Sequence, residues 1–339
     1  MLAACRVAKT DTTPVWFMRQ AGRCLPDYRK LRQRHAILEI ARTPELAARV
    51  SLMPVEQLGV DGAVIFADIV LPIAGMGVGV DIVADVGPVI ERPIRSIADV
   101  ERLRPLNPEA DVPFVLDAIR MIRQELNGRA AVIGFAGAPF TLACYLIEGR
   151  PSRDFTAARA MMFGQPDLWV ALMDRLTDAT IVYLKAQVTA GAQVVQLFDS
   201  WGGSLSPADY ARSVLPWNRR IFDAVRETGV PSVSFATANA HLLDLTRMAG
   251  SDVVSIDWRV DFEDAWRRFG YDRAIQGNLD SARPVAGWEP TLVGARELMS
   301  TVAGRPGHIF NLGHGVMPDT DPDVLRRLVD FVHTEGARS

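Results

Sequence analysis

Two arginines, Arg19 and Arg23, lie in a polar turn that directly follows the apolar run Pro14–Met18. The turn also contains Gly22, whose lack of a Cβ lets the backbone adopt a positive φ or lie close to a ligand. An arginine presents a planar fork of donors to a carboxylate or phosphate and keeps its charge at any working pH. Further cations follow at Arg29, Lys30 and Arg32. These residues predict an anion-binding turn; the alternative is a basic surface loop that forms ion pairs with neighbouring helices.

Polar or aromatic residues also stand where most of the other apolar runs of the chain end. In chain order they are Asp68, Thr141, Tyr145, Asp199, Ser200, Trp201, Asp257, Trp258, Asn278 and His314. Together with the arginines they suit anion binding and acid–base or electrostatic chemistry without an obvious cofactor. The sequence contains no Ser-His-Asp arrangement on a nucleophile elbow and no Walker-type phosphate loop.

Each of these side chains also has a structural alternative. Asp68 could be a buried carboxylate with satisfied hydrogen bonds or a helix cap, Tyr145 a core aromatic residue, and Ser200 a turn residue. His314 stands between two glycines that offer it no packing neighbours, which favours a functional role. The other histidines are interpreted as structural or surface residues: His35, His241, His308 and His333.

The elements that must position these residues are eight short apolar runs separated by segments with helical patterns. The runs are Pro14–Met18, Gly62–Ile69, Ala131–Gly137, Gln193–Phe198, Pro231–Phe235, Asp252–Asp257, Arg273–Gly277 and His308–Leu312. Most are continuous rather than alternating, as expected for parallel strands buried on both faces. Eight β-then-α units predict an α/β protein with a (β/α)8 TIM barrel, forming one domain over residues 1–339. An open doubly wound sheet is the alternative, but no G-x-G-x-x-G follows the first run.

In such a barrel the active site is built at the carboxyl ends of the strands, so the polar residues above are expected to meet there. Helix starts are predicted at Thr43-Pro44, Ser206-Pro207 and Asp321-Pro322, where a capping side chain precedes a proline. The longest helical pattern is Leu168–Ala190. Alternating Val and Ile residues with glycines in Gly75–Pro93 predict a β-hairpin inserted after the second strand.

The composition is that of an ordinary globular protein, with 339 residues, 49% hydrophobic and 23% charged. Residues 1–50 contain ten Lys and Arg against four Asp and Glu, whereas the whole chain carries −3. This uneven charge favours attraction of a small polyanion over nucleic-acid binding. No apolar run is long enough to span a bilayer, and the first residues lack a secretory core, so a cytoplasmic protein is expected. The three isolated cysteines suggest neither disulfides nor a structural zinc site.

Several motifs closely resemble those of the uroporphyrinogen decarboxylase family of haem and tetrapyrrole synthesis. PVWFMRQAGR (14–23) is similar to the N-terminal signature of that family, and GFAGAPFTL (134–142) to its second signature. The likeness continues in order through FADI, YLIEG, QLFDSWGGSLSP, IDW, QGNLD and HIFNLGHGVMPDT. It therefore extends over almost the whole chain.

The resemblance implies a (β/α)8 barrel, usually a homodimer with facing clefts, that needs no metal or organic cofactor. It implies that the four acetate carboxyl groups of uroporphyrinogen III are removed, giving coproporphyrinogen III and four CO2. By motif position it implies substrate contacts at Arg19, Gln20, Ala21, Gly22, Arg23, Arg32, Asp68, Tyr145, Ser200 and His314. Asp68 would hold the pyrrole N–H groups at the ring centre, and Asp68, Arg19 and Tyr145 are the expected catalytic residues.

The sequence departs from the family pattern at a few loop positions. Cys24 replaces an aromatic residue, the segment RPSRDF (150–155) lacks a glycine-serine run, FATANAH (235–241) lacks a lysine and a glycine, and LDS (279–281) replaces LDP.

Two other functions remain open. A zinc- and cobalamin-linked methyltransferase of the same superfamily would need His and Cys ligands at strand ends, and a non-catalytic tetrapyrrole carrier would bind without turnover.

Overall fold

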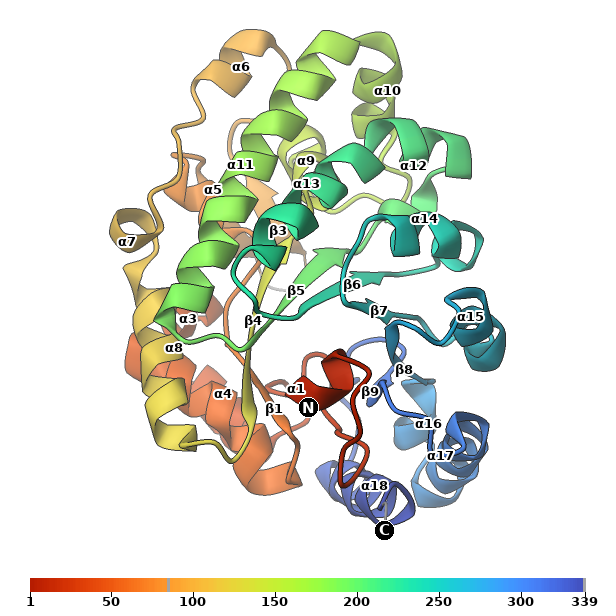
Figure 1. The fold of residues 1–339 in the computed structure, drawn as a ribbon. Coiled ribbons are helices and arrows are strands. Elements are labelled where there is room, and N and C mark those ends of the chain that lie inside the picture. The colour runs from red at the N-terminus through yellow and green to blue at the C-terminus, as the bar shows by residue number, and fades with distance from the viewer. Residues whose placement is uncertain (84–85, 338–339) are drawn as a thin grey trace.

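A computed structural model of the chain, which describes residues 1–83 and 86–337, contains seven parallel strands curled into a barrel wall with helices outside (Figure 1). The strand order is β1-β4-β5-β6-β7-β8-β9. The bounds are β1 Gly62–Val64, β4 Ala131–Gly137, β5 Val194–Asp199, β6 Ser232–Ala236, β7 Val253–Ser255, β8 Ala274–Leu279 and β9 His308–Leu312. The prediction of an α/β barrel of parallel strands is therefore confirmed.

The eighth position of the barrel is filled by the segment predicted as the first strand, Pro14–Met18. Val15 pairs with Phe310 of β9 in an isolated parallel bridge, and on its other side the carbonyl of Val15 accepts from the backbone N–H of Asp61, 2.7 Å away. The segment is not a regular strand because Pro14 lacks an N–H and the N–H groups of Val15, Phe17 and Met18 are bound by side chains, that of Val15 by Asp61. Phe17 donates to the Gln20 side chain and Met18 to the Asn311 side chain.

One strand boundary differs from its prediction by five residues. The run predicted over Gly62–Ile69 forms a strand only to Val64, because the backbone N–H of Phe66 donates to the hydroxyl of Ser51, 2.7 Å away.

The predicted hairpin is present, with β2 (Val80–Val83) antiparallel to β3 (Gly87–Ile90). The turn at 84–85 lies outside the described residues. The other predicted strands are matched within three residues at each end.

Helices cover the outside of the sheet. Up to β5 they are α1 Leu2–Cys5, α2 Pro26–Arg32, α3 Ile37–Arg42, α4 Pro44–Leu58, α5 Leu71–Gly75, α6 Ile97–Glu101, α7 Pro108–Asp111, α8 Pro113–Leu126, α9 Pro139–Glu148, α10 Thr156–Gly164 and α11 Pro166–Ala190. After β5 come α12 Pro207–Ser213, α13 Leu215–Arg226, α14 Leu243–Met248, α15 Phe262–Arg268, α16 Ala282–Val285, α17 Trp288–Val302 and α18 Pro322–Glu335, with short 3-10 turns at Gly202–Ser204 and Ala240–Leu242. All three predicted helix starts are confirmed. Ser206 and Asp321 cap their helices with side-chain oxygens, whereas the Thr43 hydroxyl instead donates to the carbonyl of Glu39.

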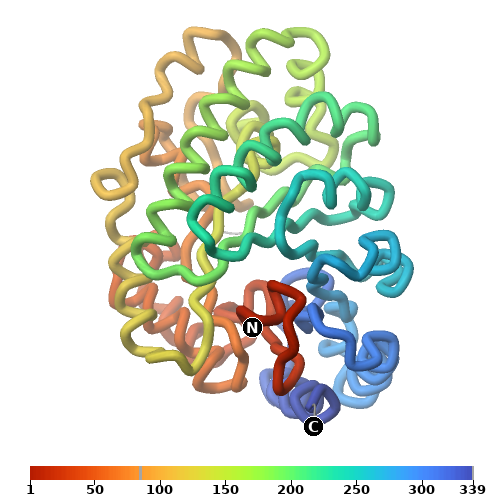
Figure 2. The backbone as a smooth tube through the Cα atoms, viewed as in Figure 1, coloured from red at the N-terminus to blue at the C-terminus, as the bar shows by residue number. Residues whose placement is uncertain are grey.

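The amino ends of the strands are covered by the first residues of the chain, shown in red in Figure 2. In α1, Ala4 and Cys5 are buried. A Cβ on Gly62 would lie 3.3 Å from the sulfur of Met1, and a Cβ on Gly307 would lie 3.2 Å from Val7. Helix α1 and its neighbours therefore fill this end of the barrel, and the polar loops lie at the opposite, carboxyl ends of the strands.

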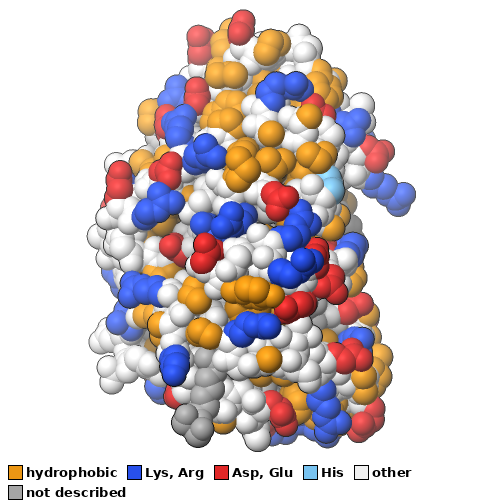
Figure 3. Space-filling model, turned by 45° about the vertical axis from the view of Figure 1, so that its right-hand side comes forward, with side chains coloured by type: hydrophobic (Ala, Val, Ile, Leu, Met, Phe, Trp, Pro, Cys, Tyr) orange, Lys and Arg blue, Asp and Glu red, His pale blue; other side chains and the backbone are white. Residues whose placement is uncertain are grey.

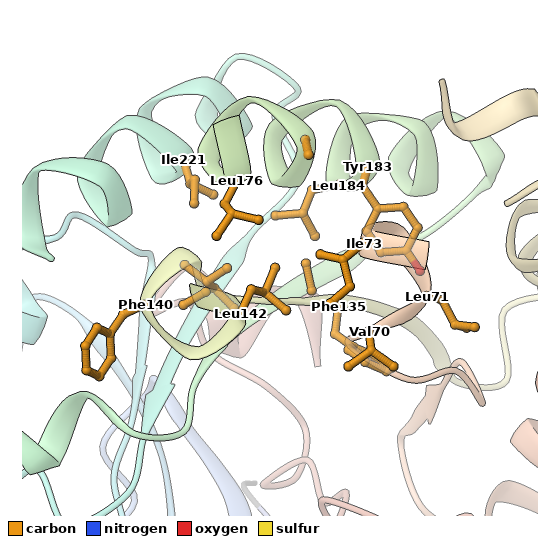
Figure 4. Close-up of a cluster of buried hydrophobic side chains, with 14 of the residues drawn as sticks. Val70, Leu71, Ile73, Phe135, Phe140, Leu142, Leu176, Tyr183, Leu184 and Ile221 are labelled. Atoms are coloured by element: carbon orange, nitrogen blue, oxygen red, sulfur yellow. The ribbon is translucent and has the colours of Figure 1, made fainter. Parts of the chain in front are cut away.

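The core has an apolar layer outside the sheet and a polar interior. Outside, side chains from β4, α5, α9, α11 and α13 pack together, including Phe135, Leu176 and Ile221 (Figure 4). Inside the barrel, the Gln276 amide donates to Gln196 at 3.2 Å and to Ser255 at 2.9 Å, and accepts from the indole of Trp16 at 2.9 Å. These buried amides satisfy one another, as buried polar groups must.

The outer helices carry charges of both signs. On the face seen in Figure 3, basic and acidic side chains are interspersed, with hydrophobic ones in small groups between them. Several form exposed ion pairs, such as Arg220 with Asp174 and Asp178. None of the helices in the described ranges is both long enough and apolar enough to cross a bilayer.

His333 of α18 is expected to give the barrel closure a pH-dependent stability. Its Nε2 lies 2.8 Å from Asp61, which also accepts from the backbone N–H of Val15, and the hydrogen bond to Asp61 raises the pKa of His333. A raised folded pKa stabilises the protein below the unfolded pKa of histidine, near 6.5, and this contribution is lost as pH rises through the folded value. His333→Gln should therefore lower the free energy of unfolding by about 0.5–1 kcal/mol more at pH 6 than at pH 9. Urea unfolding at both pH values measures this, and an equal loss at each would contradict it.

Candidate active site

The turn Arg19–Arg23 is fixed to the barrel by the side chain of Gln20. This side chain is buried, accepts from the backbone N–H of Phe17 at 2.9 Å and donates to the carbonyl of Gly62 at 2.6 Å. The turn itself needs a residue without a Cβ at Gly22, because a Cβ there would lie 2.5 Å from the carbonyl oxygen of Arg19. Ala21 is half-buried, and both arginine side chains are exposed. The sequence motif therefore builds a rigid turn that presents two guanidiniums.

Arg19 lies among three of the other predicted site residues. Its backbone is in the left-handed region, with φ of 59°, and its side chain packs on Gly315, where a Cβ would lie 2.6 Å from Cδ of Arg19. Burial raises the pKa values of Asp68 and Tyr145, and the positive charge of Arg19 acts against this rise. Burial and the charge of Arg19 together lower the pKa of His314. The structure thus brings Arg19 from the N-terminal turn close to residues that follow β1, β4 and β9.

Asp68 is the carboxylate of this group and lies beyond the end of β1. It is half-buried, and its Oδ1 accepts from the backbone N–H of Val70 at 3.0 Å. Burial raises the pKa of Asp68, while this hydrogen bond and the charge of Arg19 act in the opposite direction. An ionised Asp68 would therefore gain stability from any further N–H group or positive charge placed beside it.

Tyr145 and His314 face the same cluster in defined protonation states. Burial, helped by the nearby Asp68 carboxylate, raises the pKa of Tyr145 to about 12, so its phenol keeps its proton at neutral pH. Burial and the charge of Arg19 lower the pKa of His314, whose ring meets that of Trp258 edge-on at 5.9 Å. At pH 7 His314 is therefore a neutral imidazole, able to donate one hydrogen bond and accept another.

Arg23 and Arg32 lie together beside a different residue, Tyr28 of α2. Burial raises the pKa of Tyr28, and the charges of Arg32 and Arg23 lower it. The Tyr28 ring packs 5.6 Å from that of Phe66, in the segment that leads from β1 to Asp68. Arg32 also donates to the carbonyl of His35. These two arginines therefore form a second cationic position next to the Asp68 segment.

Ser200 completes the set of predicted site residues at the end of β5. It is half-buried, and its carbonyl accepts from the hydroxyl of Thr237 after β6. Its neighbour Trp201 is expected at the same strand end, but the sequence does not predict it as a substrate contact. The Trp201 ring lies 4.4 Å from that of Tyr145 and 4.4 Å from that of Phe155.

Two other residues of this region have contacts that the sequence did not indicate. Phe155 lies in the loop between α9 and α10 with φ of 48°, and no local pattern in RPSRDF indicates its contact with Trp201. Asp199 is buried and accepts from Thr141, Tyr210 and Asn218 at 3.1–3.3 Å. Burial raises the pKa of Asp199 to about 6, against the three hydrogen bonds that lower it. Its position directly after a strand was the only available signal.

The side chains that could hold a metal do not gather in the described part of the chain. Across residues 1–83 and 86–337 no three His, Cys, Asp or Glu side chains come together in a metal-binding arrangement, and Cys5, Cys24 and Cys144 are all buried. The clustered groups are instead cations, a carboxylate, a phenol and a neutral imidazole, which suit the binding of a polyanion and electrostatic catalysis.

Comparisons with known proteins show which proteins the chain resembles over its length. A family model described as uroporphyrinogen decarboxylase (URO-D) matches residues 1–335. A uroporphyrinogen decarboxylase of Streptomyces coelicolor is 53% identical over 99% of this chain and 94% of its own length. One of Carboxydothermus hydrogenoformans is 48% identical over 98% of this chain and 95% of its own.

Solved structures share the fold at low sequence identity. A methyltransferase from Methanosarcina mazei superposes with a TM-score of 0.79 at 20% identity, covering 98% of this chain and 97% of that one. A B12-independent methionine synthase from a Shewanella species gives a TM-score of 0.56 at 11% identity, covering 88% and 89%. These two likenesses concern the fold alone.

Proposed function

Because this chain belongs to the uroporphyrinogen decarboxylase family, we propose that it removes the four acetate carboxyl groups of uroporphyrinogen III. The products would be coproporphyrinogen III and four CO2, as a step of porphyrin and haem biosynthesis. The observation that carries the proposal is the full-length match to relatives of this name, at about half identity, in a chain that clusters Arg19, Asp68, Tyr145 and His314.

The substrate-binding role is assigned to the residues at the carboxyl end of the barrel. Uroporphyrinogen bears eight carboxylates, so guanidiniums at two separate positions can attract and orient it. We assign substrate contacts to the backbone and side chains of Arg19, Gln20, Ala21, Gly22, Arg23, Arg32, Asp68, Tyr145, Ser200 and His314. Since the Gln20 amide already bonds to the barrel, its contribution is to hold the turn in place.

The chemistry needs a place for the electrons that CO2 leaves behind. Protonation of the pyrrole carbon beside the acetate-bearing one makes the ring a cationic electron sink, and the C–C bond to the carboxylate then breaks. A proton added to the resulting exocyclic carbon forms the methyl group, and the ring carbon loses the proton it gained. Each acetate thus exchanges CO2 for one proton. An Asp68 carboxylate bonded to the pyrrole N–H groups would stabilise the positive charge as it develops.

Two groups of the cluster suit the handling of the proton. The phenol of Tyr145 is protonated at neutral pH and lies beside Asp68, so it can donate to the ring directly or through a bound water. Arg19 keeps its charge and serves as a fixed cation for the departing carboxylate. His314, neutral at pH 7, can donate its one N–H to a substrate carboxylate.

The proposal is tested by anaerobic incubation of the chelator-treated protein with uroporphyrinogen III. Products are oxidised and separated by their number of carboxylates. Successive seven-, six-, five- and four-carboxylate porphyrins support the decarboxylase and its independence of an added metal or organic cofactor. Unchanged eight-carboxylate material from folded protein would overturn it and favour the carrier; stoichiometric zinc in the purified protein would favour the methyltransferase.

We further propose that residues 1–339 act as one domain and that the protein is a cytoplasmic homodimer. The support for the dimer and the cytoplasmic location is the family resemblance, and the support for the single domain is the packing of the first residues against the barrel. Light scattering on the purified protein would show twice the chain mass, and limited proteolysis would leave no stable half-chain. A monomeric mass at micromolar concentration would contradict the dimer.

Arg23→Ala is expected to weaken substrate binding more than it slows turnover. Arg23 lies beside Tyr28 and Arg32 rather than among the residues around Asp68, so it is expected to contact a peripheral carboxylate. A charge-assisted hydrogen bond of this kind contributes about 1.5–3 kcal/mol, so KM should rise about tenfold to hundredfold with kcat little changed. Steady-state kinetics measure this, with Arg34→Ala, an exposed arginine of the same basic region, as the control. An unchanged KM would show that Arg23 is structural.

A further inference from the structure

The ring of Trp201 lies between two other aromatic rings that come from different parts of the chain. Its centroid is 4.4 Å from that of Tyr145 on α9, tilted by 53°, and 4.4 Å from that of Phe155, nearly parallel at 29°. Phe155 is buried, whereas Tyr145 and Trp201 are half-buried. The indole thus contacts both a core residue and Tyr145, whose pKa the Asp68 carboxylate helps burial to raise.

The loop that carries Trp201 is anchored on both sides of it. Before it, the buried Asp199 accepts three hydrogen bonds, from Thr141, Tyr210 and Asn218. After it, Gly203 lies so close to the loop after β6 that a Cβ would be 2.2 Å from the carbonyl oxygen of Thr237. The position of the indole is therefore set by the barrel itself.

Phe155 is also held in an unusual backbone conformation. Its φ of 48° lies in the left-handed region, which is unfavourable for a bulky residue. Its backbone N–H donates to the hydroxyl of Ser152 at 3.1 Å, and its ring stacks on Trp201. The loop between α9 and α10 therefore packs on the indole through Phe155.

We propose that Trp201 is a positioning residue, which fixes the Tyr145 phenol at the Asp68 carboxylate and is itself held by Phe155. This inference rests on the proposed function, since it assigns the phenol a part in the decarboxylation. Reactions of this kind are sensitive to placement, and a displacement of about 1 Å can cost about 10²-fold in rate. If Trp201 is replaced by a side chain that cannot stack on Tyr145, the phenol can move away from the position from which it reaches the substrate.

A double-mutant cycle separates this role from a direct contact with the substrate. Trp201→Leu is expected to lower kcat about tenfold to hundredfold with little change in KM. In a Tyr145→Phe background, the same replacement should lower kcat by less than about threefold, because the phenol it positions is already absent. Trp217→Leu is the matched control: Trp217 is half-buried on α13 and bonds to Asp174 in the outer helix layer. Additive losses in the cycle, or a loss confined to KM, would overturn the proposal.

A second measurement needs no substrate. The chain has five tyrosines, so ring-labelled tyrosine gives few NMR signals, and the Tyr145 signal is the one missing from Tyr145→Phe. An indole at 4.4 Å should shift the Tyr145 ring protons upfield, and both Trp201→Leu and Phe155→Leu should move them back, Phe155→Leu less far. An unshifted signal in the wild type would overturn the stack whether or not the protein turns over uroporphyrinogen. Absence of turnover in the wild type, with the shift present, would instead count against the proposed function alone.

Discussion

Asp68→Asn is expected to leave the protein folded and to lower kcat by about 10²–10³. Asparagine keeps an oxygen that can accept from the backbone N–H of Val70, so the local turn is retained. It lacks the negative charge that would stabilise the cationic ring during loss of CO2. Single-turnover rates with uroporphyrinogen III measure the loss, and near-normal rates would contradict the charge-stabilising role.

The same variant should be at least as stable as the wild type at neutral pH. Burial raises the folded pKa of Asp68, and an acid with a raised folded pKa destabilises the folded state as pH rises above its unfolded value. Removing the carboxylate removes this destabilisation of the folded state. Replacing a catalytic residue often stabilises a protein in this way. Asp280→Asn is the matched control, because Asp280 also follows a strand and accepts from the N–H two residues on. It should change neither kcat nor the melting temperature appreciably.

Arg19→Gln is expected to lower kcat/KM by about 10²–10³ and to move the acidic limb of the pH–kcat profile to higher pH. Arg19 lowers the pKa of Asp68, so its loss leaves burial less opposed and raises that pKa. Below the raised value Asp68 is protonated and cannot stabilise the ring cation, and turnover is lost at a pH where the wild type still works.

Arg19→Lys separates the effect of the charge of Arg19 from the effect of its planar guanidinium. It keeps the positive charge without the planar fork, so the acidic limb should stay near the wild-type position while KM rises. Arg34→Gln removes one charge from the same part of the chain and should leave the profile in place. An acidic limb that does not move in Arg19→Gln would show that the two groups are not coupled.

Much of the barrel is predictable because its strands are buried on both faces. Ala131–Gly137 and His308–Leu312 are continuous apolar runs with clear ends, and both strands are found over these residues. Pro14–Met18 has the same pattern, but its backbone donors are taken by side chains of Gln20 and Asn311, which no local pattern indicates. The strand was therefore not predicted correctly where its backbone groups bind side chains that the local sequence does not indicate.

The same limit applies to the site. Asp68, Tyr145 and His314 could be named in advance because each follows a strand, and barrel geometry brings strand ends together. The placement of Arg23 and Arg32 beside Tyr28 could not be read from their spacing. The stack of Phe155 on Trp201 joins two loops of different length, and loop conformation depends on packing more than on local sequence.

The bridge between Val15 and Phe310 has a consequence for how the protein is made. A ribosome releases residue 15 long before residue 310, so the segment that closes the barrel waits for its partner strand during almost all of synthesis. Until β9 is made, the free edge of the Pro14–Met18 segment and the edge of β8 lack their partner and are sites for wrong pairing. Contacts this distant in sequence form slowly, so barrel closure is expected to be the final step of folding, after the chain has left the ribosome.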